Sequence, residues 1–300
     1  MNKNMKRALL LLISGIYAIN VAANTPIVEA DLSVPSRVAP AFFGPNAFPV
    51  PDMLDGRTLS DLKMEIYIDN FFGVMAKRTV TDDFAADMFL RLTVPLFTPR
   101  VNLTLWMPVC EYFSSGPEVN EYRRIDHEGR LTGWFPGDVY VTTDIMFLIQ
   151  ERHHIDATIR AAIKSASGHG WHYARNYDSP GYFFDASFGR SFRVGSRTSF
   201  RAALSGGFLC WQTDNGRQND AVMYGVHASL TSGRLHVETE YGGYVGWEQY
   251  GDAPMTLKSA LSWDIGNFSV RLMHQVGFID WPFHQVRAGI EYRIPLCKQL

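Results

Sequence analysis

A hydrophobic period of two runs through the chain from Leu62 almost to its end. In Leu62–Asp69 the even positions are apolar and most odd positions are charged. The same alternation returns in Ile155–Lys164, Leu235–Tyr241 and Val286–Ile294. Strict alternation over this length predicts β-strands that have one apolar and one polar face.

About twelve strands are predicted, many of them ten residues long or more. They cover 62–73, 86–97, 100–113, 137–149, 155–167, 181–192, 198–211, 220–230, 234–247, 254–265, 268–278 and 284–296. Strands of soluble sheets usually have roughly five or six residues. A tilted strand needs about 9–11 residues to cross a bilayer, so these lengths favour membrane strands.

The predicted connections alternate between short and long. The short ones are 98–99, 150–154, 193–197, 231–233 and 266–267. The long ones are 74–85, 114–136, 168–180, 212–219, 248–253 and 279–283. Such sorting is typical of an up-and-down membrane barrel with short periplasmic turns and long outer loops. With an even strand count, both ends of the barrel chain lie on the periplasmic side.

Composition narrows the class of protein. The chain is 46% apolar and 19% charged, which is too apolar for a disordered protein. Beyond the N-terminus there is no run of roughly 18 apolar residues, which excludes a polytopic helical membrane protein. The net charge of −2 gives no footprint for nucleic acid. The three cysteines match neither a disulfide scaffold nor a metal cluster, and no cofactor-binding motif is present.

The N-terminus has the features of a secretory signal peptide. Lys3, Lys6 and Arg7 precede a short apolar core at residues 8–19, and Val21-Ala22-Ala23 supplies small residues for cleavage after Ala23. We therefore expect export of the chain and removal of residues 1–23.

Residues 24–60 form a Pro-rich segment that differs from everything after it. Proline lacks the donor that a sheet ladder needs, so this segment is a poor strand. Its stretch 39–44 is too apolar for a plain solvated tail. We expect it either to enter the barrel as a plug or to lie on the periplasmic surface as a cap. Residues 61–300 are then the barrel domain.

Aromatic residues gather near the predicted strand ends, as in the interfacial girdles of membrane barrels. They are Phe71, Phe72, Tyr112, Phe113, Trp134, Phe135, Tyr182, Phe183, Phe184, Trp247, Trp263, Trp281 and Tyr292. A soluble sandwich of about twelve strands would have long open edges, which invite aggregation, whereas closure removes the edges. The pattern thus favours an all-β, transmembrane, antiparallel barrel in the outer membrane over a soluble β protein.

The chain resembles Gram-negative outer-membrane β-barrels, more those of Bacteroidetes than the enterobacterial general porins. Gly137–Tyr140 followed by Ile159–Gly168 is similar to a strand pair in the MetA-pathway-type transporter barrels. The resemblance implies a porin-like channel and contact with outer-membrane lipid and the barrel-insertion machinery. Such barrels often finish on an aromatic residue that this machinery recognises, whereas this chain ends with Pro295–Leu300.

If the polar parity faces inward, charges of both signs line the lumen in near balance. The predicted lining residues are Lys63, Glu65, Asp69, Asp87, Arg91, Asp138, Asp144, Arg160, Lys164, Asp185, Arg201, Glu238, Glu240, Lys258, Asp264, Arg271, Arg287, Glu291 and Arg293. They predict either a pore whose charges bias the choice of small solutes or a lattice of ion pairs that braces the wall. The sequence does not decide whether copies of the chain associate.

An enzyme is the main functional alternative to a channel. Across the turn Gly266-Asn267, the pairing places Ser259 beside His274 on the lipid face, where polar groups are costly. A Ser nucleophile and a His base could serve an acyl hydrolase, and Thr239 on the next strand would extend the polar spot. A subunit contact, a register slip or a Ser–His hydrogen bond explains the pair more simply. We expect no enzymatic activity, and a closed structural or adhesive barrel is the third hypothesis.

Overall fold

A computed structural model of the protein describes residues 46–73, 82–175, 180–213, 217–247 and 251–296. The predicted signal peptide and the first part of the Pro-rich segment lie outside these residues. Among the described residues, no helix is long and apolar enough to cross a membrane.

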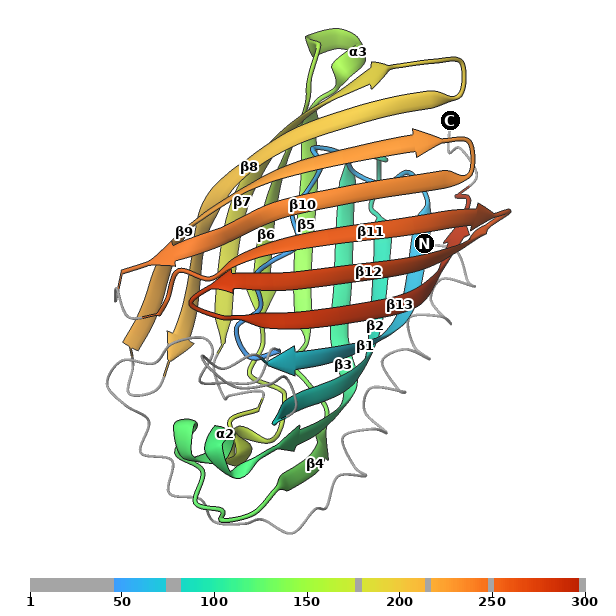
Figure 1. Ribbon diagram of the computed structural model, residues 1–300. Coiled ribbons are helices and arrows are strands. Elements are labelled where there is room, and N and C mark those ends of the chain that lie inside the picture. The colour runs from blue at the N-terminus through green and yellow to red at the C-terminus, as the bar shows by residue number, and fades with distance from the viewer. Residues whose placement is uncertain (1–45, 74–81, 176–179, 214–216, 248–250, 297–300) are drawn as a thin grey trace.

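Twelve antiparallel strands close into a barrel, as predicted (Figure 1). They are β1 (Leu62–Gly73), β2 (Asp83–Pro95), β3 (Val101–Ser115), β5 (Tyr140–Leu148), β6 (Asp156–Lys164), β7 (Gly181–Arg193), β8 (Thr198–Thr213), β9 (Arg217–Ser232), β10 (Leu235–Gly246), β11 (Met255–Ile265), β12 (Phe268–Ile279) and β13 (Phe283–Ile294). Neighbours in sequence pair along the whole series, and β1 also pairs with β13. The closed ladder leaves no edge strand on the barrel wall.

The two ends of the barrel carry different connections. The short-turn end holds α3 (Gln150–His153) and the two-residue turn at Gly266, whose φ of +65° suits glycine. The opposite, long-loop end holds α2 (Pro117–Tyr122), β4 (Leu131–Phe135) and the short helix η2 (Trp171–Tyr173).

Two predictions about the long-loop end were wrong. The link 114–136 contains β4, which pairs with Glu111–Ser115 beyond the point where β3 leaves β5. The expected long link 212–219 is mostly strand, because β8 and β9 continue further than the alternation indicates, and the link 279–283 shortens to residues 280–282 between β12 and β13. The sorting of short and long connections is therefore less regular than the sequence predicts.

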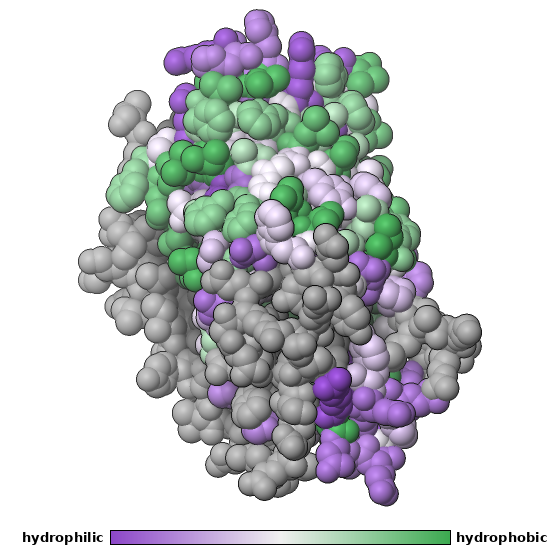
Figure 2. All heavy atoms as spheres, turned by 90° about the vertical axis from the view of Figure 1, so that its left-hand side faces the viewer, coloured by the Kyte–Doolittle hydropathy of each residue, from purple (hydrophilic) through white to green (hydrophobic). Residues whose placement is uncertain are grey.

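The outside of the barrel is apolar and the inside is polar. Ile66 and Ile159 are 46% and 45% exposed, whereas the neighbouring Arg160 is only 6% exposed. Most other large exposed residues on the strands are also Ile, Val, Leu or Phe. Figure 2 shows hydrophobic side chains gathered over the strands below a polar cap at the end that carries α3. This inside-out arrangement belongs to a barrel surrounded by acyl chains.

The aromatic girdle was only partly predicted correctly. Trp134, Trp247 and Trp263 are exposed on the outside. Phe71 and Phe113, with Phe135, Phe183 and Trp281, are instead buried in the interior. Successive strand residues point to opposite faces, so a pair such as Phe71-Phe72 supplies only one residue to a girdle.

Candidate functional site in the barrel interior

Residues 46–60, called here the lumen segment, cross the interior from the long-loop end to the short-turn end (Figure 1). At the long-loop end the Asn46 side-chain nitrogen donates to Oε2 of Glu111 on β3 at 2.6 Å. Phe48 is 3% exposed, and its ring centroid lies 6.3 Å from that of Trp211 on β8. The first residues of the lumen segment thus contact buried side chains on the inner face of the barrel.

Halfway along the lumen, the segment makes ion pairs with the wall. Asp52 Oδ1 lies 2.8 Å from Nζ of Lys258 on β11, and Oδ2 lies 3.2 Å from Nη1 of Arg91 on β2. Further on, the Asp55 carbonyl oxygen accepts from Nε and Nη2 of Arg201 on β8, at 2.9 and 2.6 Å. These contacts tie the segment to opposite sides of the barrel.

The last residues of the segment are fixed through their backbone. The Gly56 carbonyl oxygen accepts from the Thr158 hydroxyl at 2.8 Å. The Asn102 side chain pairs with the backbone of Leu59 in both directions, at 2.6 and 2.9 Å. The segment then leads into β1 at the short-turn end.

Two wall glycines allow the lumen segment to approach closely. A β-carbon at Gly225 on β9 would overlap the Met53 sulfur, and one at Gly189 on β7 would overlap the carbonyl oxygen of Asp55. Glycine is the residue that permits such close contact of a backbone with another chain segment. The wall is therefore shaped around this segment.

The long-loop half of the interior is an apolar, mainly aromatic cluster. Phe71 packs with its ring centroid 5.2 Å from that of Phe283, and Phe113 packs 5.8 Å from Phe135. All four side chains are at most 7% exposed. In this conformation the cluster fills the long-loop end of the lumen.

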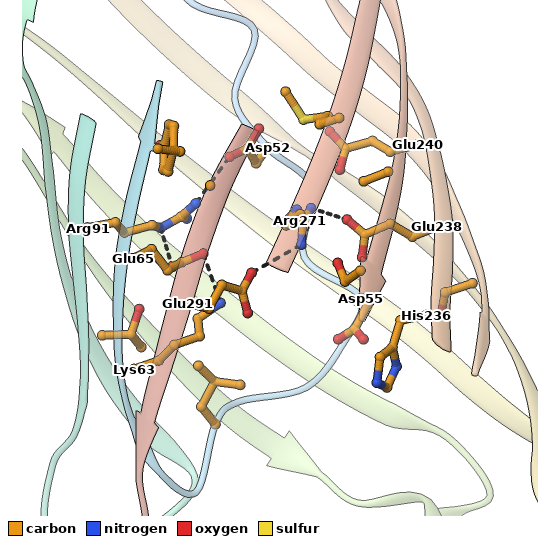
Figure 3. A pocket seen from close by; sticks show the side chains of 18 of the residues that line it. Asp52, Asp55, Lys63, Glu65, Arg91, His236, Glu238, Glu240, Arg271 and Glu291 are labelled. Carbon is orange, nitrogen blue, oxygen red and sulfur yellow. Dashed lines mark hydrogen bonds and ion pairs between the residues drawn. The ribbon is translucent and has the colours of Figure 1, made fainter. Parts of the chain in front are cut away.

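The short-turn half contains a cavity of about 350 Å³ with a charged lining (Figure 3). Its acidic and basic residues are Asp52, Asp55, Arg57, Lys63, Glu65, Arg91, Asp144, Glu238, Glu240, Lys258, Arg271, Arg287, Glu291 and Arg293. The two signs are equal in number, and most of these residues form ion pairs, some across strands and some within one strand. Arg271 lies between Glu238 and Glu291, and Lys63 Nζ lies 3.2 Å from Glu65 Oε1.

Other ion pairs are sealed inside the wall. Arg160 Nε lies 2.7 Å from Asp185 Oδ1, and Lys164 Nζ lies 2.6 Å from Asp138 Oδ2, with both Lys164 and Asp138 side chains 0% exposed. Asp138 precedes β5 rather than lying on it, and burial raises its pKa although Lys164 opposes that effect. Buried pairs of this kind hold strands together only while both partners are present.

Each predicted lining residue is buried or half-buried in the structure. Those that line the cavity are Lys63, Glu65, Arg91, Asp144, Glu238, Glu240, Lys258, Arg271, Arg287, Glu291 and Arg293. Those elsewhere are Asp69, Asp87, Asp138, Arg160, Lys164, Asp185, Arg201 and Asp264. Asp264 pairs with His236 at 2.8 Å, and Asp69 pairs with Arg287 at 3.1 Å. A role of any of them in solute passage stays a prediction.

Sequence reasoning missed the partners that the lumen segment and β3 contribute. Asn46, Asp52 and Asp55 lie in a segment without periodicity, so no pattern gives their direction. Glu111 follows a β-bulge between β2 and β3 and pairs with Arg175 at 2.6 Å. The bulge reverses the parity of β3, because Asn102 and Thr104 are buried before it and Glu111 is buried after it, so strict alternation would have placed Glu111 on the outside.

The Ser259–His274 pair lies in the predicted register on adjacent strands. Ser259 Oγ is 3.4 Å from the Thr239 hydroxyl, and His274 Nε2 is 3.3 Å from Nδ1 of His284. In the described part of the chain, no hydrogen bond joins Ser259 to His274. The described residues also include no group of three or more His, Cys, Asp or Glu that could hold a metal ion.

Comparison with known proteins establishes the fold. No family model and no curated protein sequence matches the chain. The crystal structure of an outer-membrane channel from Pseudomonas putida F1 is similar at a TM-score of 0.53 and 11% identity, over 81% of this chain and 100% of that one. The chain therefore has the fold of an outer-membrane channel, which agrees with the predicted outer-membrane localisation.

Two further solved structures are more distant. The KdgM porin has a TM-score of 0.46 at 10% identity, over 77% of this chain and 99% of that one. The β-domain of the Bordetella autotransporter BrkA has a TM-score of 0.43 at 9% identity, over 78% and 99%.

Proposed function

We propose that the protein is a porin-like channel for small solutes and that the lumen segment closes it in the conformation described. Passage runs through both halves of the lumen and requires displacement of the segment from the wall, including Ala47 and Phe48, which belong to the aromatic cluster at the long-loop end. The predicted lining residues then bias the choice of solute through their charges. The protein performs no chemistry on what it transports.

The observation that supports this proposal is the way the segment is held. It contacts the wall through side chains and single hydrogen bonds rather than through a ladder of backbone hydrogen bonds, as at Asp52 and Leu59. A structural core strand would join the sheet, whereas a separable segment can leave without opening the barrel. The cavity of about 350 Å³ beside it supplies space for movement.

We also propose that the chain is related to the MetA-pathway-type transporter barrels and to Bacteroidetes proteins. The barrel-insertion machinery recognises it, the barrel contacts outer-membrane lipid, and copies of the barrel can associate. Residues 1–23 are removed as a signal peptide, and the barrel domain begins after residue 60.

The acyl-hydrolase alternative has less support. His274 contacts a second imidazole, that of His284, instead of a carboxylate that would orient a catalytic base. Ser259 shares its hydroxyl environment with Thr239. A polar spot of this kind on the outer face needs no reaction to explain it.

Planar-bilayer recording of Gly225→Val tests the channel. The added side chain occupies the space of Met53, so we expect frequent ion-conducting openings in potassium chloride, whereas the unaltered protein stays mostly closed. Gly189→Val, which collides with Asp55, should act in the same way.

Gly206→Val is the matched control for this experiment. It makes the same substitution at an exposed glycine, where an added β-carbon would meet only the Met223 carbonyl oxygen, at an ordinary contact distance of 3.8 Å. We expect it to behave as the unaltered protein does. If Gly225→Val and Gly189→Val insert as closed barrels, as shown by heat-modifiable gel mobility, and neither conducts, the protein is a closed structural barrel.

A further inference from the structure

The contacts of Pro49–Asp52 point to a class of solute. This stretch has an apolar body, Pro49-Val50-Pro51, followed by a single carboxylate. The body lies beside a small cavity of about 70 Å³, whose lining includes eight aromatic residues together with arginine and other polar side chains, and Val50 packs against the apolar cluster. The carboxylate reaches Lys258 and Arg91.

The wall that receives the apolar body is a ladder of stacked rings on adjacent strands. Tyr67 and Phe89 stack with ring centroids 5.0 Å apart, and Trp106 and Tyr140 stack at 3.8 Å. The Phe89 and Trp106 rings, 6.3 Å apart, connect the two pairs. Flat aromatic surfaces of this kind bind other rings and compact apolar groups.

At its Tyr67 end, the series of stacked rings meets arginine side chains. The Arg287 guanidinium lies over the Tyr67 ring at 4.4 Å from its centroid. Tyr67, Arg91, Arg287 and Asp52 line both the aromatic cavity and the charged cavity, so the two cavities meet at the Asp52 carboxylate. The Asp52 side chain is 40% exposed, which shows that this meeting point is accessible from the cavity.

We propose that the barrel binds small carboxylates with an aromatic or similarly compact apolar body, and that Pro49–Asp52 occupies their site. This inference rests on the proposed function and names its solute. Lys258 and Arg91 receive the solute carboxylate in place of Asp52, and the ring of the solute lies on the aromatic ladder. The lumen segment therefore competes with the solute.

The wall also keeps such binding reversible. Lys258 Nζ lies 2.8 Å from Glu240 Oε1, and Arg91 Nε lies 3.8 Å from Glu65 Oε2. When Asp52 leaves, the two cations are still partly neutralised by these acids. A carboxylate solute is then held by hydrogen bonds and ring contacts rather than by an unbalanced charge, which suits a site through which solute passes.

Isothermal titration of benzoate into the detergent-solubilised full chain tests the inference. The unaltered protein should bind weakly because the tethered Asp52 is present at a high effective concentration. Asp52→Ala should bind benzoate about tenfold tighter or more. Adding Lys258→Met or Arg91→Met to Asp52→Ala should weaken benzoate binding about tenfold or more, since each substitution deletes a charged hydrogen-bond donor. Arg234→Met, in an exposed turn, should have no effect.

Two further ligands test the two halves of the site. Benzamide keeps the ring without the charge, and acetate keeps the carboxylate without the ring; we expect both to bind Asp52→Ala at least about tenfold more weakly than benzoate does. If benzamide binds as tightly as benzoate, the solute needs no carboxylate. If acetate binds as tightly as benzoate, the aromatic ladder does not contribute to binding. Benzoate binding that neither Asp52→Ala nor Lys258→Met changes would overturn the site.

The channel and the site can fail separately. Conductance of Gly225→Val in potassium chloride, without benzoate, reports the channel alone. If Gly225→Val conducts but Asp52→Ala does not bind benzoate, only the solute assignment is wrong. If Asp52→Ala binds benzoate but Gly225→Val does not conduct, only the channel proposal is wrong. If Asp52→Ala does not form a heat-modifiable barrel, Asp52→Asn replaces it, because it keeps the side-chain volume.

Discussion

At the long-loop end the interior of the barrel is dry and aromatic, whereas at the short-turn end it is charged and encloses a cavity. At the long-loop end Trp211 is only 1% exposed, whereas at the short-turn end the side chain of Arg271 is 31% exposed. Both halves contact the same lumen segment. The aromatic half holds it by packing and by the buried Asn46–Glu111 hydrogen bond, and the charged half holds it by ion pairs at Asp52, whose side chain is 40% exposed.

The same kind of interaction therefore has a different weight in the two halves. The Lys164–Asp138 pair has no exposed side-chain surface, while about a third of the Arg271 and Glu238 side chains is exposed. Breaking a buried pair leaves an uncompensated charge, but a solvated pair exchanges its partner for water at little cost. Stability resides mainly at the long-loop end, which leaves the charged end freer to change.

The largest loss of stability is expected for Trp211→Ala. The substitution removes a ring that packs against Phe48 and Phe183 and creates a cavity, which should cost about 4 kcal/mol of unfolding free energy. Urea unfolding in micelles measures it. Trp247→Ala is the control, because that ring is 71% exposed and its loss should cost less than about 1 kcal/mol. Equal losses would show that the interior is not packed as described.

Lys164→Met is expected to have the next largest effect. It leaves Asp138 buried without its cation and should cost about 3 kcal/mol in the same urea assay. The double variant Lys164→Met with Asp138→Asn removes both charges and should recover more than half of that loss. If the single variant is as stable as the unaltered protein, the pair is not sealed from water.

The strands were predictable because their two faces meet different surroundings. Ile66 and Glu65 differ in exposure as the alternation indicates, since lipid selects one parity and the interior selects the other. Strand ends were less predictable. β4 pairs with the outer end of β3, and β8 and β9 pair up to Thr213 and Arg217, so these strand ends are set by backbone pairing that the alternation does not report.

The site was predictable only where it lies on strands. Parity alone brought Lys258 and Arg91 to one interior, although they are far apart in sequence. Asp52, which joins them, belongs to a segment whose path is set by tertiary contacts such as Met53 against Gly225. No local rule describes such a path, so the sequence left it open whether the segment enters the barrel.

The smallest effect is expected for Arg271→Gln in the charged half. Arg271 bridges Glu238 and Glu291, but about a third of the Arg271 and Glu238 side chains is exposed and Glu291 keeps Arg293 at 3.5 Å, so we expect the unfolding free energy to fall by less than about 1 kcal/mol. The loss should shrink further at 1 M salt, where the Debye length is about 3 Å. The Lys164→Met loss should hardly change with salt, because that pair is shielded from ions. A large loss for Arg271→Gln that is insensitive to salt would mean that the charged half is as dry as the aromatic half, and the contrast between the two ends would disappear.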